Sequence, residues 1–296
     1  MTSDGEFFPG FTSHRVGTRV TEIRCVVGGD GPPVLLLQGY PQTHVMWHRV
    51  APALARHYTV VCADLRGYGD SGKPASDETH AVYSKRAMAD DMVELMRDLG
   101  HPQFRLVGHD RGGRVAHRLC IDHPDAVSQL AVLDVSPTRT MYARTDQAFA
   151  TAYYHWFFLI QPFDLPERLI GADPAYYLQR KLGGWGTGIT HFDPRALAEY
   201  TRCFSDPATI HATCEDYRAS ASIDLTHDVA SESHKIGCPM LVLWGDKGVV
   251  HRLFAPLDDW RAVASDVRGC ALPCGHYLAE ERPEETLREL ETFFAM

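Results

Sequence analysis

The chain has 296 residues, of which 45% are hydrophobic and 23% are charged, and its formal net charge is −9. This length and composition are typical of one large α/β domain with an insertion, or of two modest globular domains. The negative charge argues against non-specific binding to nucleic acid or to an anionic membrane, whereas a small anionic substrate would respond to local charge.

The cysteines and the first residues bear on where the protein works. The eight cysteines are scattered singly, with no C-x-x-C pair, so we expect reduced thiols rather than a disulfide framework or a zinc site. Residues 1–10 contain neither a basic segment nor a long apolar run, and they do not resemble a signal peptide. No segment reaches the roughly 20 apolar residues that cross a bilayer. We therefore expect a cytoplasmic protein that does not bind membranes.

Strand and helix patterns alternate through the first half of the chain. Residues 14–27 alternate between polar and apolar side chains, which predicts an antiparallel hairpin. Short apolar runs then predict buried strands, and residues 84–99 have apolar positions at helical spacing. The predicted buried strands are residues 34–37, 58–64, 104–107 and 130–135. This order is typical of a mostly parallel sheet that helices cover on both faces.

The pattern changes after Pro137. The segment 138–220 has no convincing strand, is rich in aromatic residues and is interrupted by prolines, and strand patterns resume at 239–244 and 267–272. We predict an α/β-hydrolase core formed by residues 1–137 and 221–296. Residues 138–220 are predicted to form an inserted helical cap.

The stretch Gly108-His109-Asp110-Arg111-Gly112 lies between a predicted strand and a predicted helix. It matches G-x-nucleophile-x-G, the nucleophile elbow, in which small residues allow a sharp strand-to-helix turn. A carboxylate in the nucleophile position is poor against esters but can displace a leaving group from saturated carbon, forming an alkyl ester. A structural aspartate at a helix N-cap would give the same local sequence, so the elbow alone does not establish catalysis.

A hydrolase site of this type also needs a histidine and an acid later in the chain. His276 follows the last predicted strand and is the expected general base. Asp134 and Asp246 each end a predicted parallel strand, at the edge where open α/β sheets place their sites. The residues alone do not separate these two candidate acids.

Arg111 and Arg114 lie in the first turn of the predicted elbow helix, three residues apart. The helix dipole disfavours cations at an N-terminus, and residues at this spacing share a face. Arginine pairs well with carboxylates in bidentate geometry. The pair therefore suggests a substrate carboxylate held next to Asp110, although two solvated or ion-paired arginines would give the same pattern.

The sequence resembles the fluoroacetate dehalogenases of the α/β-hydrolase superfamily over nearly its whole length. Seven motifs carry this resemblance: GYPQTHVMWHRVAP at 39–52, KRAMA at 85–89, GHDRG at 108–112, LDVSPT at 133–138, HWFFL at 155–159, CEDYRA at 214–219 and GH at 275–276.

The resemblance implies a reaction and a role for each matching residue. Asp110 would attack the α-carbon of a short 2-haloacid in line with the departing halide, and His276 would activate the water that hydrolyses the resulting ester. It favours Asp134 as the acid beside His276, with Arg111 and Arg114 as the carboxylate clamp. It also implies a homodimer that needs no cofactor and no metal. The residues implied to donate hydrogen bonds to the halide are His155, Trp156 and Tyr217.

The sequence also departs from the superfamily pattern. Gln38 stands where a histidine commonly precedes Gly-x-Pro. The backbone N–H groups of Tyr40 and Arg111 can still stabilise the oxyanion formed during ester hydrolysis, because that role uses no side chain. Residues 139–142, at the entry to the predicted cap, look divergent, which leaves the pocket size open.

Three other functions are compatible with parts of this pattern. Haloalkane dehalogenases carry Trp after the nucleophile, where this chain has Arg111. Epoxide hydrolases share the Asp–His–acid set and use cap tyrosines, for which Tyr153, Tyr154 and Tyr217 are available. A non-catalytic protein of the same fold would not be expected to keep both Asp110 and His276. We expect hydrolysis of a 2-haloacid such as fluoroacetate, with epoxide hydrolysis as the alternative.

Overall fold

The computed structural model describes residues 4–296. Residues 1–3, the start of the segment in which no signal peptide is predicted, lie outside the described residues. Within the described part of the chain, no helix is long and apolar enough to cross a bilayer.

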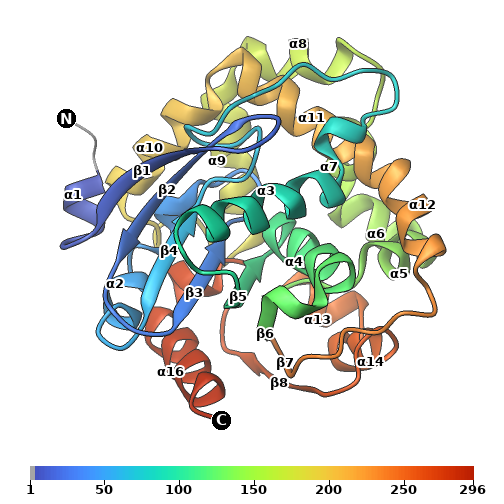
Figure 1. The fold of residues 1–296 in the computed structure, drawn as a ribbon. Helices are drawn as coiled ribbons and strands as arrows, with labels where there is room; N and C mark the ends of the chain where they lie inside the picture. Colours follow the sequence, from blue (N-terminus) through green and yellow to red (C-terminus); the bar gives the residue numbers. More distant parts are fainter. Residues whose placement is uncertain (1–3) are drawn as a thin grey trace.

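The core is an eight-stranded sheet with the order β1-β2-β4-β3-β5-β6-β7-β8 (Figure 1). The first two pairings are antiparallel and the others are parallel. The predicted mostly parallel sheet and the predicted hairpin are thus confirmed. The strands are β1 Thr12–Gly17, β2 Glu22–Gly28, β3 Pro33–Leu37, β4 Thr59–Ala63, β5 Phe104–His109, β6 Val127–Leu133, β7 Met240–Gly245 and β8 Val267–Leu272.

Helices cover the sheet because its central strands are apolar on both faces. All residues of β3 after its first are fully buried, as parallel strands between two helical layers require. Helices α3 and α4 pack against each other, and so do helices α2 and α16. The helices of the core are α1 Asp4–Phe7, α2 Ala51–Leu54, α3 Lys85–Asp98, α4 Arg111–Asp122, α13 Val249–Leu253, α14 Pro256–Arg261, α15 Leu278–Glu281 and α16 Pro283–Phe294, with 3-10 turns η1 His44–Trp47, η2 Ala81–Tyr83 and η3 Pro124–Ala126.

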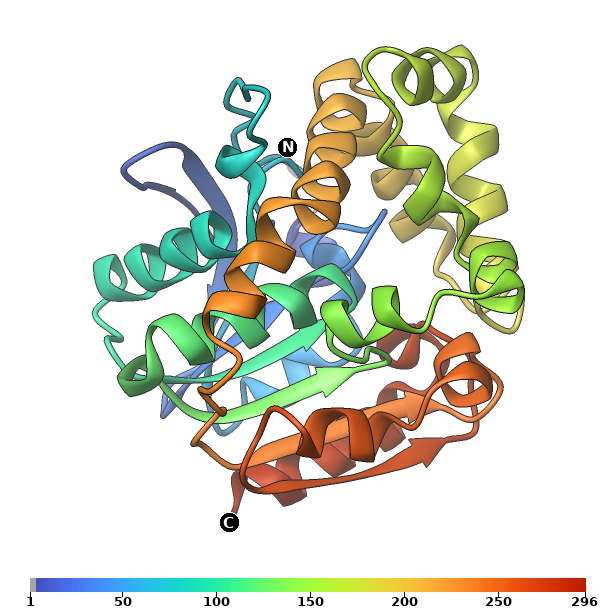
Figure 2. The same ribbon diagram turned by 90° about the vertical axis from the view of Figure 1, so that its right-hand side faces the viewer.

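A set of helices follows β6 and forms a layer over the sheet (Figure 2). These helices are α5 Thr138–Ala143, α6 Gln147–Ala152, α7 Tyr154–Leu159, α8 Leu165–Ala172, α9 Pro174–Trp185, α10 Pro194–Phe204, α11 Pro207–Ala221 and α12 Ile223–Ala230. The expected boundary at residue 220 falls in the last turn of α11, and α12 extends the strand-free segment further.

The sheet register brings the four loops that carry the predicted site residues to one edge. His109 of β5 pairs with Leu133 of β6, and Leu133 pairs with Leu243 of β7. Gly245 of β7 pairs with Leu272 of β8. The loops that leave these four strands at their carboxyl ends are therefore neighbours, which is where open α/β sheets bind ligands.

Candidate active site

Asp110 occupies the turn between β5 and α4 in a strained backbone conformation, with φ 45° and ψ −110°. A positive φ is costly for a residue with a Cβ and is retained when the surrounding structure demands it. The close packing at the two flanking glycines shows how tight this turn is. A Cβ on Gly108 would lie 2.4 Å from the carbonyl oxygen of Gly112, and a Cβ on Gly112 would lie 2.6 Å from the carbonyl oxygen of Leu37. The turn is thus a nucleophile elbow with an aspartate at its apex.

His276 and Asp134 lie on the loops beside this elbow. Nδ1 of His276 lies 2.6 Å from Oδ2 of Asp134, and both side chains are buried. The other carboxylate oxygen of Asp134 accepts a hydrogen bond from the backbone N–H of Gly245 at 3.0 Å. Asp246, the competing acid, is exposed to solvent. The carboxylate that contacts His276 is therefore that of Asp134.

The surroundings of Asp110 keep it ionised. Burial alone would raise the pKa of its carboxyl, but the electrostatic interactions with His276, Arg114 and Arg111 outweigh burial and lower the pKa below its ordinary value. The backbone N–H of Tyr40 donates to Oδ2 of Asp110 at 3.1 Å. Asp110 is therefore a buried carboxylate anion whose charge is stabilised by its neighbours.

The guanidinium of Arg111 is held by residues of α11. Its Nε and Nη2 donate to the two carboxylate oxygens of Asp216 on α11, at 2.8 and 2.7 Å, and Nη2 also lies 2.6 Å from Oγ of Ser220. The remaining nitrogen, Nη1, is buried and has no hydrogen-bond partner among residues 4–296. Arg111 therefore has one terminal NH2 group left to donate to another acceptor.

The guanidinium of Arg114 is buried without an anionic partner among the described residues. It donates through Nη1 to Oγ1 of Thr138 at 2.9 Å and to the carbonyl oxygen of Ser136 at 3.3 Å, and its Nε is unpartnered. Its carbon Cζ lies 4.5 Å from the centre of the Trp156 ring. A buried charge with no counter-ion is expensive, so this arrangement favours an anionic ligand.

Helices α7 and α11 supply donors close to the two arginines. His155 and Trp156 lie on α7 and Tyr217 lies on α11, and all three side chains are buried. Nε1 of Trp156 and the hydroxyl of Tyr217 have no hydrogen-bond partner in the part of the chain that the structure describes. The Tyr217 ring lies 4.1 Å from Cζ of Arg111, and its centre is 5.5 Å from that of His155.

Sequence reasoning missed three residues that build this region. Asp216, which holds Arg111, also accepts hydrogen bonds from Tyr68 at 2.6 Å and from the ammonium of Lys85. Lys181 and Trp185 of α9 lie against His155. Asp216 precedes Tyr217 in a quoted motif, so a search for the counter-ion of a buried arginine could have found it. No local signal marks Lys181.

The departure at Gln38 has a structural explanation. With its amide atoms assigned by their neighbours, the side chain donates to the carbonyl oxygen of Ala63 at 2.7 Å and accepts from the N–H of Leu65 at 3.0 Å. It therefore ties the end of β3 to the end of β4, and its backbone oxygen accepts from the N–H of Gly112 at 2.9 Å.

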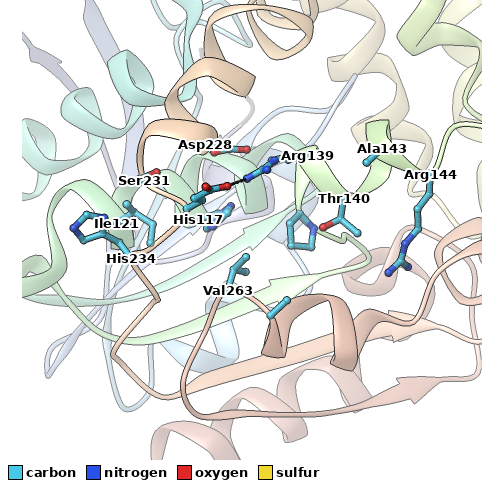
Figure 3. Close-up of a pocket in the computed structure, with 13 residues that line it drawn as sticks. His117, Ile121, Arg139, Thr140, Ala143, Arg144, Asp228, Ser231, His234 and Val263 are labelled. Carbon is cyan, nitrogen blue, oxygen red and sulfur yellow. Dashed lines mark hydrogen bonds and ion pairs between the residues drawn. The ribbon is translucent and has the colours of Figure 1, made fainter.

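A separate cavity of about 430 Å³ opens beside α4, α5 and α12 (Figure 3). Its lining combines basic and acidic side chains, among them Arg139, Arg144, Asp228 and Glu232. No predicted site residue lines it, so this cavity is distinct from the group around Asp110.

Comparisons with known proteins agree with this geometry. Residues 32–283 match the family model described as the alpha/beta hydrolase fold. A fluoroacetate dehalogenase from Burkholderia sp is 50% identical over 97% of this chain and 95% of its own length. A soluble epoxide hydrolase from Corynebacterium sp. (strain C12) is 34% identical over 96% of this chain and 97% of its own. The crystal structure of a protein from Nostoc sp PCC 7120 is 60% identical, with a TM-score of 0.95, over 96% of this chain and 98% of that one.

Proposed function

The chain belongs to the α/β-hydrolase family, and within it to the fluoroacetate dehalogenases, and from this premise we propose that it converts fluoroacetate and water to glycolate, fluoride and a proton. Other short 2-haloacids fit the same chemistry. The observation that carries the proposal is a set of four buried donor atoms without partners on the predicted site residues: Nη1 of Arg111, Nε of Arg114, Nε1 of Trp156 and the hydroxyl of Tyr217. The charges of two of these residues, Arg111 and Arg114, lower the pKa of Asp110.

In the first half of the proposed reaction, a carboxylate oxygen of Asp110 attacks the α-carbon. The carbon–oxygen bond of an ester forms as the carbon–halogen bond breaks, and the halide leaves with the bonding electron pair. The lowered pKa of Asp110 supports this role, because only the anion is nucleophilic. Arg111 and Arg114 hold the substrate carboxylate.

The second half releases the product. His276 takes a proton from a water molecule whose oxygen attacks the carboxyl carbon of Asp110, and Asp134 stabilises the protonated histidine. The backbone N–H groups of Tyr40 and Arg111 stabilise the oxyanion; the contact of Tyr40 with Oδ2 of Asp110 supports its part. Collapse of the tetrahedral intermediate regenerates Asp110 and frees the 2-hydroxy acid.

The cap donors are proposed to solvate the departing halide. Fluoride is small and strongly basic, so a carbon–fluorine bond breaks only if the developing anion is well solvated. His155, Trp156 and Tyr217 would each donate one hydrogen bond, and a donor aimed at developing charge contributes roughly 3 kcal/mol in comparable oxyanion sites.

The proposal predicts halide release from haloacetates. We expect fluoride release from fluoroacetate and chloride release from chloroacetate, measured with ion-selective electrodes beside turnover of styrene oxide. The epoxide is included because the Corynebacterium relative is an epoxide hydrolase and because the unpartnered hydroxyl of Tyr217 could protonate an epoxide oxygen. Turnover of the epoxide without release of either halide would contradict the proposed dehalogenation and favour epoxide hydrolysis.

Replacing Arg114 with Leu tests the carboxylate clamp. We expect kcat/KM for fluoroacetate to fall by about 100-fold or more, since removing one partner of a buried charge pair costs roughly 2–5 kcal/mol. The matched control is Arg118→Leu, which removes an arginine of the same helix that is equally buried, 4% exposed in both cases, and that pairs instead with Asp122. An undiminished kcat/KM in the Arg114 variant would remove the clamp from the mechanism.

We also propose that the protein is a homodimer, assembled through the cap. Large apolar side chains are exposed on and before α8 and on α9: Phe163, Leu165, Leu169 and Tyr176 are 50–71% exposed, which is typical of an interaction surface. Sedimentation equilibrium is expected to give twice the chain mass, and Leu169→Asp is expected to weaken the dimer. Val20→Asp, at an exposed apolar residue between β1 and β2, is the control. A monomeric wild type contradicts this assembly.

A cytoplasmic location remains part of the proposal. The eight cysteines are all free in the structure, and six of them are buried, which fits reduced thiols.

A further inference from the structure

Lys181 is a buried lysine whose hydrogen bond leads to the proposed halide site. It lies on α9 and is 3% exposed. Its Nζ lies 2.8 Å from Nδ1 of His155. No carboxylate of the described residues forms an ion pair with it, which is unusual because lysine is rarely buried without an anionic partner. Such a placement calls for a role in the site rather than in the stability of the cap.

Two aromatic rings, rather than a carboxylate, lie next to the amine of Lys181. Nζ of Lys181 lies 3.7 Å from the centre of the Trp185 ring and 5.7 Å from that of Tyr154. A cation over such a face is stabilised by the ring quadrupole, and tryptophan is the best of the aromatic residues. Burial lowers the pKa of Lys181 well below its ordinary value, and the negative charge of Asp110 opposes this change. The ring contacts, like the charge of Asp110, act against burial, because each of them stabilises the ammonium form.

An ammonium group has three donors and no acceptor. If Lys181 is protonated, Nδ1 of His155 must accept, and the ring proton must then sit on Nε2. Nε2 of His155 has no hydrogen bond to any residue between 4 and 296. Burial and the positive charges of Lys181 and Arg111 also lower the pKa of His155 well below its ordinary value, so the ring is neutral and carries a single proton.

We propose that Lys181 is a positioning residue that donates to Nδ1 of His155, fixes the Nε2–H tautomer, and so makes His155 a permanent hydrogen-bond donor to the departing halide. The effect on halide release rests on the proposed function, whereas the contact between Lys181 and His155 does not. Fluoride accepts hydrogen bonds more strongly than chloride, so the fixed donor matters most for fluoride. Lys181 would thereby set the leaving-group preference of the enzyme.

The tautomer can be tested in the unmodified protein. Long-range ¹⁵N–¹H spectra separate the two neutral tautomers of histidine by their nitrogen shifts, and the His155→Asn variant identifies the signals of His155 by their disappearance. We expect protonated Nε2 and unprotonated Nδ1 in the wild type. A proton on Nδ1 would mean that a neutral Lys181 accepts from the ring, and it would overturn the proposal without any Lys181 variant.

The Lys181→Met variant tests the consequence, with Lys235→Met at an exposed site as control. We expect kcat for fluoroacetate to fall about tenfold more than kcat for chloroacetate, with KM nearly unchanged because the arginines still bind the carboxylate. Equal losses for both halides, or a rise in KM alone, would mean a structural role and contradict the proposal.

Misfolding of the variant and failure of the proposed function can each be distinguished from failure of this inference. If Lys181→Met does not fold, as judged by circular dichroism, the wild-type tautomer alone decides between support and rejection. If the wild type releases no halide from either acid, the proposed function fails, while the ¹⁵N spectra still decide whether Lys181 donates to His155.

Discussion

Replacement of Asp110 with Asn is expected to abolish halide release, lowering kcat for fluoroacetate by at least about 10,000-fold, as loss of a covalent nucleophile does in other hydrolases. The amide has nearly the shape of the carboxylate but lacks its negative charge, and it cannot form the ester. It also removes the anion that the field of His276, Arg114 and Arg111 stabilises. The measurement is fluoride release over hours at high enzyme concentration.

Asp246→Asn is the matched control for this variant. Asp246 is an acid that follows the neighbouring strand β7, but it is exposed and does not contact His276. We expect it to keep near wild-type activity. If Asp110→Asn released fluoride at a tenth of the wild-type rate or faster, direct attack by water on carbon would be the better mechanism. Loss of activity in Asp246→Asn would return Asp246 to the candidate acids.

Replacement of His276 with Asn is expected to divide the reaction into its two halves. Formation of the ester needs the Asp110 anion and the arginines, whereas its hydrolysis needs a base to activate water. We therefore expect one fluoride per active site, followed by arrest, with steady-state turnover lower by at least about 1,000-fold. Mass spectrometry of the intact protein is expected to show the added mass of one carboxymethyl group, located on Asp110 by peptide mapping.

His57→Asn, at an exposed histidine after α2, is the control for this experiment. It is expected to turn over normally and to carry no adduct. Steady turnover in His276→Asn would show that another group activates the water. The absence of both the first fluoride and the adduct would place His276 in the first half of the reaction and contradict its assignment as the base of the second.

The tight turn at Asp110 and the class of fold were predictable because they depend on residues close together in sequence. The G-x-nucleophile-x-G spacing around Asp110 encodes a turn whose tightness follows from the absence of two Cβ atoms. Alternating apolar runs and amphipathic segments likewise encode a parallel sheet between helices. The strand-free stretch after Pro137 was visible as a change of pattern, and eight helices follow there.

The partners within the site depend on contacts between distant segments. Asp134 and Asp246 look equivalent in sequence, since each follows a buried strand, and the choice between them comes from the 2.6 Å contact of Asp134 with His276 across 142 residues. The two arginines also look alike. Asp216, more than a hundred residues away, accepts hydrogen bonds from Nε and Nη2 of Arg111. Arg114 has no such carboxylate partner among the described residues.

The sequence by itself therefore determined the class of fold and the turn that places a carboxylate beside two arginines, from which the type of chemistry is proposed. Only the tertiary structure decided which acid contacts the histidine, which of the two arginines is paired with a carboxylate, and that Lys181 contacts His155. The physical reason is that turns and buried strands follow from local sterics and apolar periodicity, whereas ion pairs and hydrogen bonds in a buried site depend on how the helices after β6 pack over the sheet.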